Sequence, residues 1–249
     1  ANFVAVDSGN PLQYVDQLLS ACDQPFFAPN SYIHWQLYQT ALNKGCSQLL
    51  DGIDGDSTVG HSWDRLLDLF WSGHWVNAYQ EVAAVSRNFR VGRKQLIQEY
   101  LLVPTVRRLR GESKAAPFNA CLREDFKQLI EANKPPEVSP PKGLSNSRNL
   151  HWGTLTSGLH QYVLELADHA TQALGLKACY PFFDKRLVEF CLSTRSEVKL
   201  RHGWPRWIMR EAMDGVLPKE IQWRAQKAQL ASSLQKGLLS YERQRIEQL

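Results

Sequence analysis

Three carboxylates and two glycines fall within six consecutive residues: Asp51, Gly52, Asp54, Gly55 and Asp56. The glycines let backbone amides and carboxylates turn toward one point. Oxygen ligands of this kind suit a hard divalent cation such as Mg2+, above all one that arrives already bound to phosphates. A calcium loop fits less well, because no Glu stands about six residues after the glycine. A solvated acidic turn is the other interpretation of these residues.

The same segment has a second interpretation, because Gly55, Asp56, Ser57 and Gly60 resemble the nucleophile block of the GDS-type esterases. Ser57 would then be the nucleophile, and a serine nucleophile needs a base that an acid orients. Those enzymes carry Asp-x-x-His near their end, and this chain contains no such motif. His61 lies four residues after Ser57, but the sequence indicates no acid to partner it. The esterase is therefore kept only as a distant alternative.

A stretch of cations and aromatic residues, 199–210, is the second group with chemical potential. Arg206 and Arg210 lie four residues apart, on one face of a predicted helix, and Arg224 and Lys227 follow. Fixed cations offset the charge that develops on a leaving phosphate, so ATP phosphate or pyrophosphate is the expected ligand. The alternative is a solvated cationic face above buried tryptophans.

Short strands are expected to position the acidic loop. Residues 3–6 and 46–50 both read as strands, and a strand-helix-helix-strand connection returns to the same sheet. We therefore expect these two segments to be neighbouring parallel strands. The acidic loop would then lie at the carboxyl end of a strand, where open α/β folds bind their ligands.

Most of the remaining chain shows the 3.6-residue period of helices. Helices are expected over residues 12–19, 31–42, 159–170 and 184–192, with three more between 63 and 109. Asp184 should be the N-cap of its helix. Pro104 should kink or end the third helix of the 63–109 region. Residues 133–149 contain four prolines and no apolar period, which predicts a linker.

The composition excludes several classes of protein. Of the 249 residues, 43% are hydrophobic and 22% charged, which is typical of a globular chain and excludes disordered, collagen-like and coiled-coil proteins. No apolar run approaches the roughly 20 residues of a membrane span, and no export signal is recognisable. A net charge of +4 is too small to indicate nucleic-acid binding. Five cysteines without CxxC spacing favour free thiols in the cytoplasm.

Two separated blocks of the chain resemble the asparagine synthetase family. Residues 180–190, 210–221 and 224–227 follow the order and spacing of the family's carboxyl-terminal block, and residues 49–56 are similar to its second phosphate and metal loop. Residues 180–184 and 204–209 look most similar to the branch that closes lasso peptides and to related synthetase-like proteins of unassigned substrate. The resemblance implies a strongly α-rich α/β fold, part of an adenine-nucleotide α-hydrolase-like (PP-loop) parallel-sheet domain followed by a helical region.

The resemblance also implies an ATP-dependent ligase that forms an amide. A carboxylate, on a small molecule or a peptide, attacks ATP and becomes adenylated as pyrophosphate leaves. Ammonia or an amine then displaces AMP. The implied cofactors are ATP and Mg2+, and no nucleic acid or membrane is implied as a partner.

The family's functional residues can be placed individually. Asp56 matches the aspartate that holds Mg2+ on pyrophosphate. Lys227 matches the lysine that approaches the phosphates, and Arg224 beside it either shares this role or pins the loop. The other residues that the resemblance places in the nucleotide site are Gly52, Asp54 and Gly55. Asp56 and Lys227 should therefore face one cleft, within ~10 Å of each other.

The chain departs from the family pattern in three places. Ile53 stands where asparagine synthetases carry an acidic residue, so the resemblance does not extend to aspartate as the substrate. Lys177 and Cys179 replace the Glu and Arg that usually precede the Pro-Phe-Leu-Asp block. No Ser-Gly-Gly-x-Asp-Ser motif occurs, and the glutaminase domain is absent. Because the family places both upstream, we expect a longer protein that continues ahead of Ala1.

We accordingly expect three consecutive regions. Residues 1–110 would form a partial nucleotide-binding synthetase domain with the acidic loop 51–56, residues 111–150 an irregular Pro-rich connection, and residues 151–249 the helical carboxyl-terminal part of the same domain. A noncatalytic, largely helical binding or maturation partner that retains the family core is the alternative. The chain by itself should turn over ATP weakly or not at all, because one side of the phosphate cradle would lie before Ala1.

Overall fold

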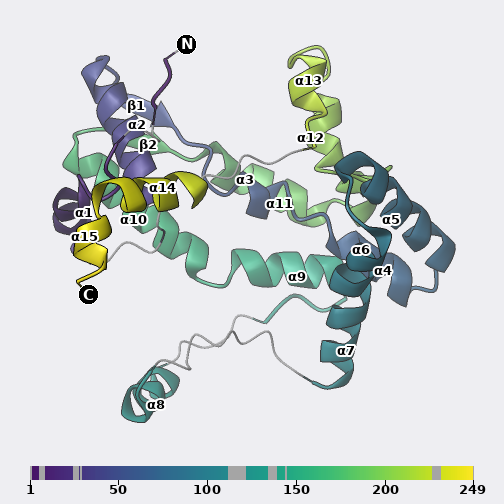
Figure 1. Ribbon diagram of the computed structural model, residues 1–249. Coiled ribbons are helices and arrows are strands. Elements are labelled where there is room, and N and C mark those ends of the chain that lie inside the picture. Colours follow the sequence, from purple (N-terminus) through teal and green to yellow (C-terminus); the bar gives the residue numbers. More distant parts are fainter. Residues whose placement is uncertain are drawn as a thin grey trace. The chain divides into compact units, whose positions relative to one another are not determined.

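A computed structural model describes the arrangement of the chain (Figure 1). The described residues are 2–5, 9–24, 28, 30–111, 122–133, 139–143, 145–225 and 231–248. They are mostly helical, with one small parallel sheet and one short antiparallel hairpin. The expectation of an α-rich fold with a parallel sheet is confirmed. Among these residues, none of the helices is both long enough and apolar enough to cross a membrane.

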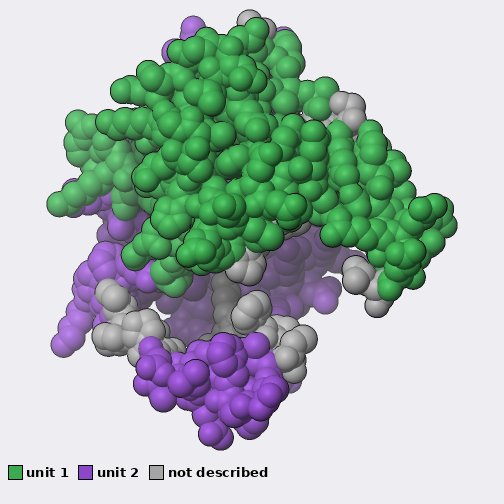
Figure 2. Space-filling view, turned by 90° about the vertical axis from the view of Figure 1, so that its left-hand side faces the viewer, with its two compact units in different colours: residues 1–55, 157–188, 226–249 green, residues 56–156, 189–225 purple. Residues whose placement is uncertain are grey.

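The chain divides into two compact units, coloured separately in Figure 2. The first unit comprises residues 1–55, 157–188 and 226–249, and the second unit comprises residues 56–156 and 189–225. Each unit thus brings together segments that are distant in the sequence. The predicted functional boundaries at residues 110 and 150 stay a prediction.

The first unit is built from helices around the parallel sheet. Its elements are α1(Val15–Cys22), α2(Ser31–Asn43), β1(Gln48–Leu50), α10(Leu159–Ala173), β2(Lys177–Cys179), the 3-10 turn η3(Pro181–Phe183), α14(Ala231–Tyr241) and α15(Arg243–Ile246). Its core packs α1, α2 and α10 together through Leu18, Trp35, Tyr38, Leu166 and Leu176. The helices predicted over residues 12–19, 31–42 and 159–170 are confirmed, with somewhat different bounds.

The second unit is helical apart from its hairpin. Its elements are α4(Asp64–Trp71), α5(Trp75–Phe89), α6(Arg93–Ile97), the π-helical turn η1(Gln98–Leu102), α7(Val103–Leu109), α8(Glu124–Ala132), α9(Asn146–Leu155), the 3-10 turn η4(Ser196–Val198), β3(Leu200–Arg201), β4(Trp204–Pro205), α12(Trp207–Ala212) and α13(Lys219–Gln222). Leu66, Val82, Val85 and Leu200 are almost fully buried at its centre. Two further helices, α3(Gly55–Thr58) and α11(Lys185–Ser193), cross the division between the units.

The parallel sheet pairs β1 with a strand that the sequence did not predict. Gln48 is opposite Lys177 and Leu50 is opposite Cys179. The prediction that residues 3–6 form the neighbouring strand is wrong for the described residues 3–5, which have no regular structure; Val6 lies outside the described residues. Phe3 is 93% exposed, so this segment does not bury the apolar side chains that suggested a strand. Strand β2 escaped notice because three residues are too few to show a period.

The predicted helices between residues 63 and 109 form, but Pro104 does not end the third one. A continuous helical run extends from Arg93 to Leu109, and the turn just before the proline, Gln98–Leu102, widens to a π-helix. A π-turn accommodates the carbonyls that lose their usual donor at the proline. The prediction that Pro104 ends the helix is therefore wrong, because the helical run continues through the proline. The alternative, that Pro104 kinks the helix, stays a prediction.

The predicted irregular connection over residues 111–150 contains helices. The described part includes α8 and the first half of α9. Phe126, Leu129 and Ile130 recur at helical spacing in α8, a signal that the neighbouring prolines obscured. The hydroxyl of Ser145 caps α9 by accepting a hydrogen bond from the backbone of Arg148. Only part of this range is therefore irregular.

The β3–β4 hairpin closes against α5 through a glycine. His202 and Gly203 form its turn, with φ of 51° and 74°, and Glu81 accepts hydrogen bonds from both of their backbone amides. A Cβ on Gly203 would lie only 2.3 Å from the backbone carbon of Ala84. The turn thus needs glycine both for its conformation and for its contact with α5.

Gly203→Ala should destabilise the protein much more than Gly175→Ala. Gly175 has a similar φ of 72° but open space around its missing Cβ, so its substitution adds only the strain of a left-handed residue, about 1–2 kcal/mol. Gly203→Ala adds a backbone clash, worth about 1–3 kcal/mol more. Urea unfolding of both variants measures the difference. Equal losses would contradict the close approach of the hairpin to α5.

Candidate functional site

Asp51 is the first residue after β1, at the carboxyl edge of the parallel sheet. Its backbone amide donates to the carbonyl of Cys179 at 2.9 Å. Its carboxylate accepts from the hydroxyl of Tyr38 at 2.9 Å and from the amide of Ile53 at 3.0 Å. Asp51 therefore fastens the acidic loop to α2 and to the sheet.

A second tyrosine–carboxylate pair lies after the neighbouring strand. The Tyr180 hydroxyl, one residue beyond β2, donates to Asp168 of α10 at 2.9 Å. Burial, together with the adjacent carboxylates, raises the pKa of Tyr180 and also that of Tyr38. Both hydroxyls thus stay protonated and act as donors, which ties α2 and α10 to the strand ends.

Asp54 turns toward α10. Its φ of 57° places it in the left-handed region, which an Asp side chain tolerates better than most. Its carboxylate lies 3.0 Å from Nδ1 of His160, which is 5% exposed. The sequence did not predict His160, because a histidine inside an amphipathic helix carries no signal of its own.

The two glycines of the loop differ in their surroundings. A Cβ on Gly52 would meet nothing within 4 Å. A Cβ on Gly55 would lie 3.1 Å from the Phe182 ring, so this glycine lets the loop pack against η3. Their predicted contacts with a nucleotide stay a prediction.

Asp56 pairs with Arg206 in the second unit. The two side chains are 50% and 43% exposed, so both are accessible to a ligand. Arg206 immediately precedes α12, with a φ of 57°, and its amide donates to the Ser62 hydroxyl at 3.2 Å. Partial burial lowers the pKa of the Arg206 guanidinium. An exposed carboxylate beside a fixed guanidinium offers one group for a metal and one for a phosphate.

Arg210 does not share this exposed face, contrary to the expectation from its spacing with Arg206. Its guanidinium donates to the backbone carbonyls of Pro205, Gln222 and Arg224, and it lies 4.8 Å from the centroid of the Trp204 ring. Arg210 lies in α12, and these hydrogen bonds join the end of α13 to the hairpin. It is a structural residue, because these acceptors satisfy its donors.

Lys199 is buried instead of facing a phosphate. It is 4% exposed, and its Nζ lies 3.0 Å from Nδ1 of His151, which is fully buried. Nε2 of His151 lies 2.9 Å from the carbonyl oxygen of Ser57. Because a carbonyl only accepts, Nε2 carries the imidazole proton and Nδ1 accepts from the lysine. The contacts of Lys199 with His151, and of His151 with the Ser57 carbonyl, thus hold the backbone of the residue that follows Asp56.

His61 stacks on His151, with ring centroids 4.6 Å apart. Its Nδ1 lies 2.7 Å from Asp64, an acid partner that the sequence did not indicate, and its Nε2 lies 3.3 Å from the Thr154 hydroxyl. Neither of these contacts involves Ser57. The described residues do not form the Ser57–His61–acid arrangement that the esterase alternative requires.

Of the two predicted catalytic residues, Arg224 and Lys227, only Arg224 is among the described residues. The backbone carbonyl of Arg224 accepts from Arg210 at 3.3 Å, which fixes the chain at this point. Lys227 lies outside the described residues, so its proximity to Asp56 stays a prediction.

The acidic loop does not form a metal cage from protein ligands alone. Among the described residues, no cluster of three or more His, Cys, Asp or Glu side chains is arranged to hold a metal. Asp51 and Asp54 have their partners in the first unit, and Asp56 has Arg206 in the second. Mg2+ is commonly held by one or two carboxylates together with substrate phosphates. The residues thus fit a metal that is bound mainly by phosphates and held by Asp56.

The contribution of Lys199 to stability should grow between pH 8 and about 10.4, whereas the buried thiols of Cys22 and Cys191, whose pKa values burial raises, act in the opposite direction in wild type and variant alike. Burial lowers the pKa of Lys199 to about 8, against roughly 10.4 in an unfolded chain. Between these values the Lys199 side chain is protonated in the unfolded state and deprotonated in the folded state, so its contribution to the free energy of unfolding increases with pH, by about 3 kcal/mol. Lys199→Met should lose this increment, whereas Lys44→Met, at an exposed site, should keep it. Urea unfolding at pH 7.5 and 10 tests this, and equal pH dependence in Lys199→Met and wild type would contradict it.

Comparison with known proteins gives a consistent result. The family described as Asparagine synthase matches residues 2–249. An asparagine synthetase [glutamine-hydrolyzing] of Triphysaria versicolor is 38% identical over 84 residues, covering 30% of this chain and 14% of that protein. A Sandersonia aurantiaca protein of the same name is 36% identical over 99 residues (36% and 19%), and asparagine synthetase B of Escherichia coli (strain K12) is 29% identical over 93 residues (36% and 17%).

The matches to these curated relatives span less than a fifth of their length. No solved structure matches significantly. The family match covers almost the entire chain and includes both the acidic loop and the carboxyl-terminal block. The protein belongs to the asparagine synthase family.

Proposed function

We propose that the protein is an ATP-dependent ligase that forms an amide bond. A carboxylate oxygen attacks the α-phosphorus of ATP, the bond to the bridging oxygen breaks, and pyrophosphate leaves. The nitrogen of ammonia or an amine then attacks the acyl carbon, AMP leaves, and the nitrogen releases a proton. Family membership supports this reaction, and the accessible Asp56–Arg206 pair is the observation that carries it.

Each side chain has a distinct role in this proposal. Asp56 holds Mg2+, which when bound neutralises charge on the pyrophosphate that leaves. Arg206 donates to phosphate oxygens. Lys227 approaches the same phosphates, and Arg224 fixes the segment that carries it. The residues that shape the loop in front of Asp56 are Gly52, Asp54 and Gly55.

The finer features of the proposal follow from the family. The β1–β2 pair would be part of a PP-loop nucleotide-binding sheet, with the first pyrophosphate loop and a glutaminase domain supplied by a longer protein. The acyl substrate is a small-molecule or peptide carboxylate, and residues 180–184 favour the lasso-peptide branch. We propose a cytoplasmic location.

Asp56→Asn should abolish most pyrophosphate release from ATP in the full-length protein. The substitution removes one charge at nearly constant volume, and loss of such a contact costs roughly 10^2- to 10^3-fold in rate. Lys227→Met should act similarly. Stability should change little, because a half-exposed ion pair contributes about 0–1 kcal/mol. Pyrophosphate release with candidate carboxylates, together with melting curves, measures both effects.

The matched control is Asp214→Asn, which removes a carboxylate from another exposed ion pair, with Lys219. It should retain wild-type turnover. Full turnover in Asp56→Asn would place the phosphate site elsewhere. An intact wild type that neither binds ATP nor releases pyrophosphate with any acyl substrate, yet binds a partner peptide, would establish the noncatalytic alternative.

A further inference from the structure

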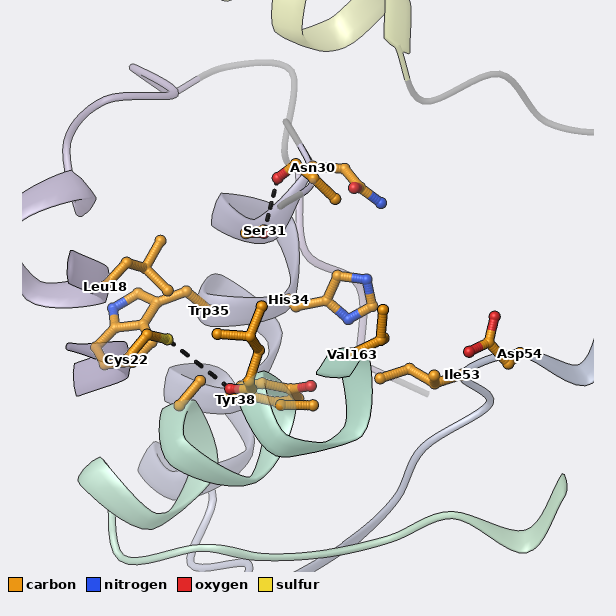
Figure 3. Close-up of a pocket in the computed structure, with 14 residues that line it drawn as sticks. Leu18, Cys22, Asn30, Ser31, His34, Trp35, Tyr38, Ile53, Asp54 and Val163 are labelled. Carbon is orange, nitrogen blue, oxygen red and sulfur yellow. Dashed lines mark hydrogen bonds between the residues drawn. The ribbon is translucent and has the colours of Figure 1, made fainter. Parts of the chain in front are cut away.

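The first unit contains a cavity of about 270 Å³ between α1, α2, α10 and the acidic loop. Figure 3 shows Leu18, Cys22 and Trp35 at one end, Ile53 and Asp54 at the other, and His34 between them. Most of its lining is apolar, with helix α10 contributing residues such as Leu166 and Ala170. The volume falls just below the usual range of ligand pockets, which indicates a ligand about the size of one amino-acid side chain.

Asp54 is the charged group that decides what this cavity accepts. No Lys or Arg is among the described residues that line it, and Asp54 is the lone Asp or Glu in that lining. The polar side chains that also line it are His34, Tyr38, Asn30 and Ser31. A mostly apolar cavity with one carboxylate and no Lys or Arg favours a cation over an anion.

The hydrogen bond with His160 orients the Asp54 carboxylate. The other ring nitrogen of His160, Nε2, is buried, and no hydrogen-bond partner reaches it in the part of the chain that the structure describes. A second ring proton there would be a buried donor without an acceptor, which is unfavourable. The ring proton that has an acceptor is the one on Nδ1, which donates to one carboxylate oxygen. This bond orients Asp54 and leaves its other oxygen for a ligand.

We propose that this cavity binds a primary ammonium that carries a compact apolar group. The apolar group would occupy the space between Leu18, Trp35 and Leu166, and the ammonium would donate to Asp54. The binding claim stands on the cavity alone. The further claim, that the bound molecule is the amine donor, rests on the proposed ligase function and gives it a substrate class.

Calorimetric titration with 2-phenylethylamine, in the absence of nucleotide, tests the binding claim. We expect the amine to bind and phenylacetate not to bind. Asp54→Asn should weaken amine binding by about 10- to 100-fold, the value of a charge-assisted hydrogen bond, and should leave binding of the neutral 2-phenylethanol unchanged within about twofold. Asn tolerates the left-handed backbone at this position, so the variant should fold.

Variants that fill the cavity locate the ligand. Ala170→Leu should abolish binding of both the amine and the alcohol, and the milder Ala167→Val serves if the first variant does not fold; both alanines line the cavity. Ala173→Leu, on the same helix but exposed, is the control and should bind normally. Equal affinity for phenylacetate and the amine, or amine binding that survives cavity filling in a folded variant, would overturn the proposal.

The two proposals fail in different ways. If the amine binds as described but no acyl substrate supports pyrophosphate release, the cavity assignment stands and the ligase proposal fails. If pyrophosphate is released but the amine does not bind, the ligase proposal stands and the cavity assignment fails.

Discussion

The parallel pairing of β1 with β2 is the constraint on which the acidic loop depends. The two strands are more than a hundred residues apart in the sequence, yet their pairing places Asp51 and Tyr180 at the same sheet edge. The hydrogen bonds Tyr38–Asp51 and Tyr180–Asp168 then bind α2 and α10 to that edge. These partly buried side-chain hydrogen bonds help to hold the short sheet in place, because strands of three residues contribute few backbone hydrogen bonds of their own.

The three carboxylates of the loop have separate partners, although the sequence shows them as one cluster. Asp51 holds the loop, Asp54 turns to His160 and the cavity, and Asp56 meets Arg206. The buried Lys199–His151 pair supports the backbone just after Asp56 through the Ser57 carbonyl. A buried lysine without an adjacent carboxylate is costly, which is consistent with its role in fixing one conformation of this turn.

Local sequence signals predicted the elements that depend on local interactions. The period of α10 and the capping of α11 by Asp184, whose carboxylate accepts from the Arg186 amide at 2.9 Å, were both predicted correctly. The strand before the acidic loop was also correct. The partner of β1, the burial of Lys199 and the structural use of Arg210 depend on segments distant in the sequence, so no local pattern revealed them. His160, the partner of Asp54, was missed for the same reason. Asp64 is only three residues from His61, so a local pattern could have revealed that contact.

The central claim is that Asp56, and not the loop as a whole, holds a metal that phosphates bring with them. Electron paramagnetic resonance with Mn2+ in place of Mg2+ tests this in the full-length protein. We expect the protein to bind Mn2+ together with ATP and to bind Mn2+ alone at least about tenfold more weakly. Asp56→Asn should weaken the ternary complex about tenfold or more, and Asp214→Asn should not. Tight Mn2+ binding without ATP, or an undiminished ternary complex in Asp56→Asn, would contradict it.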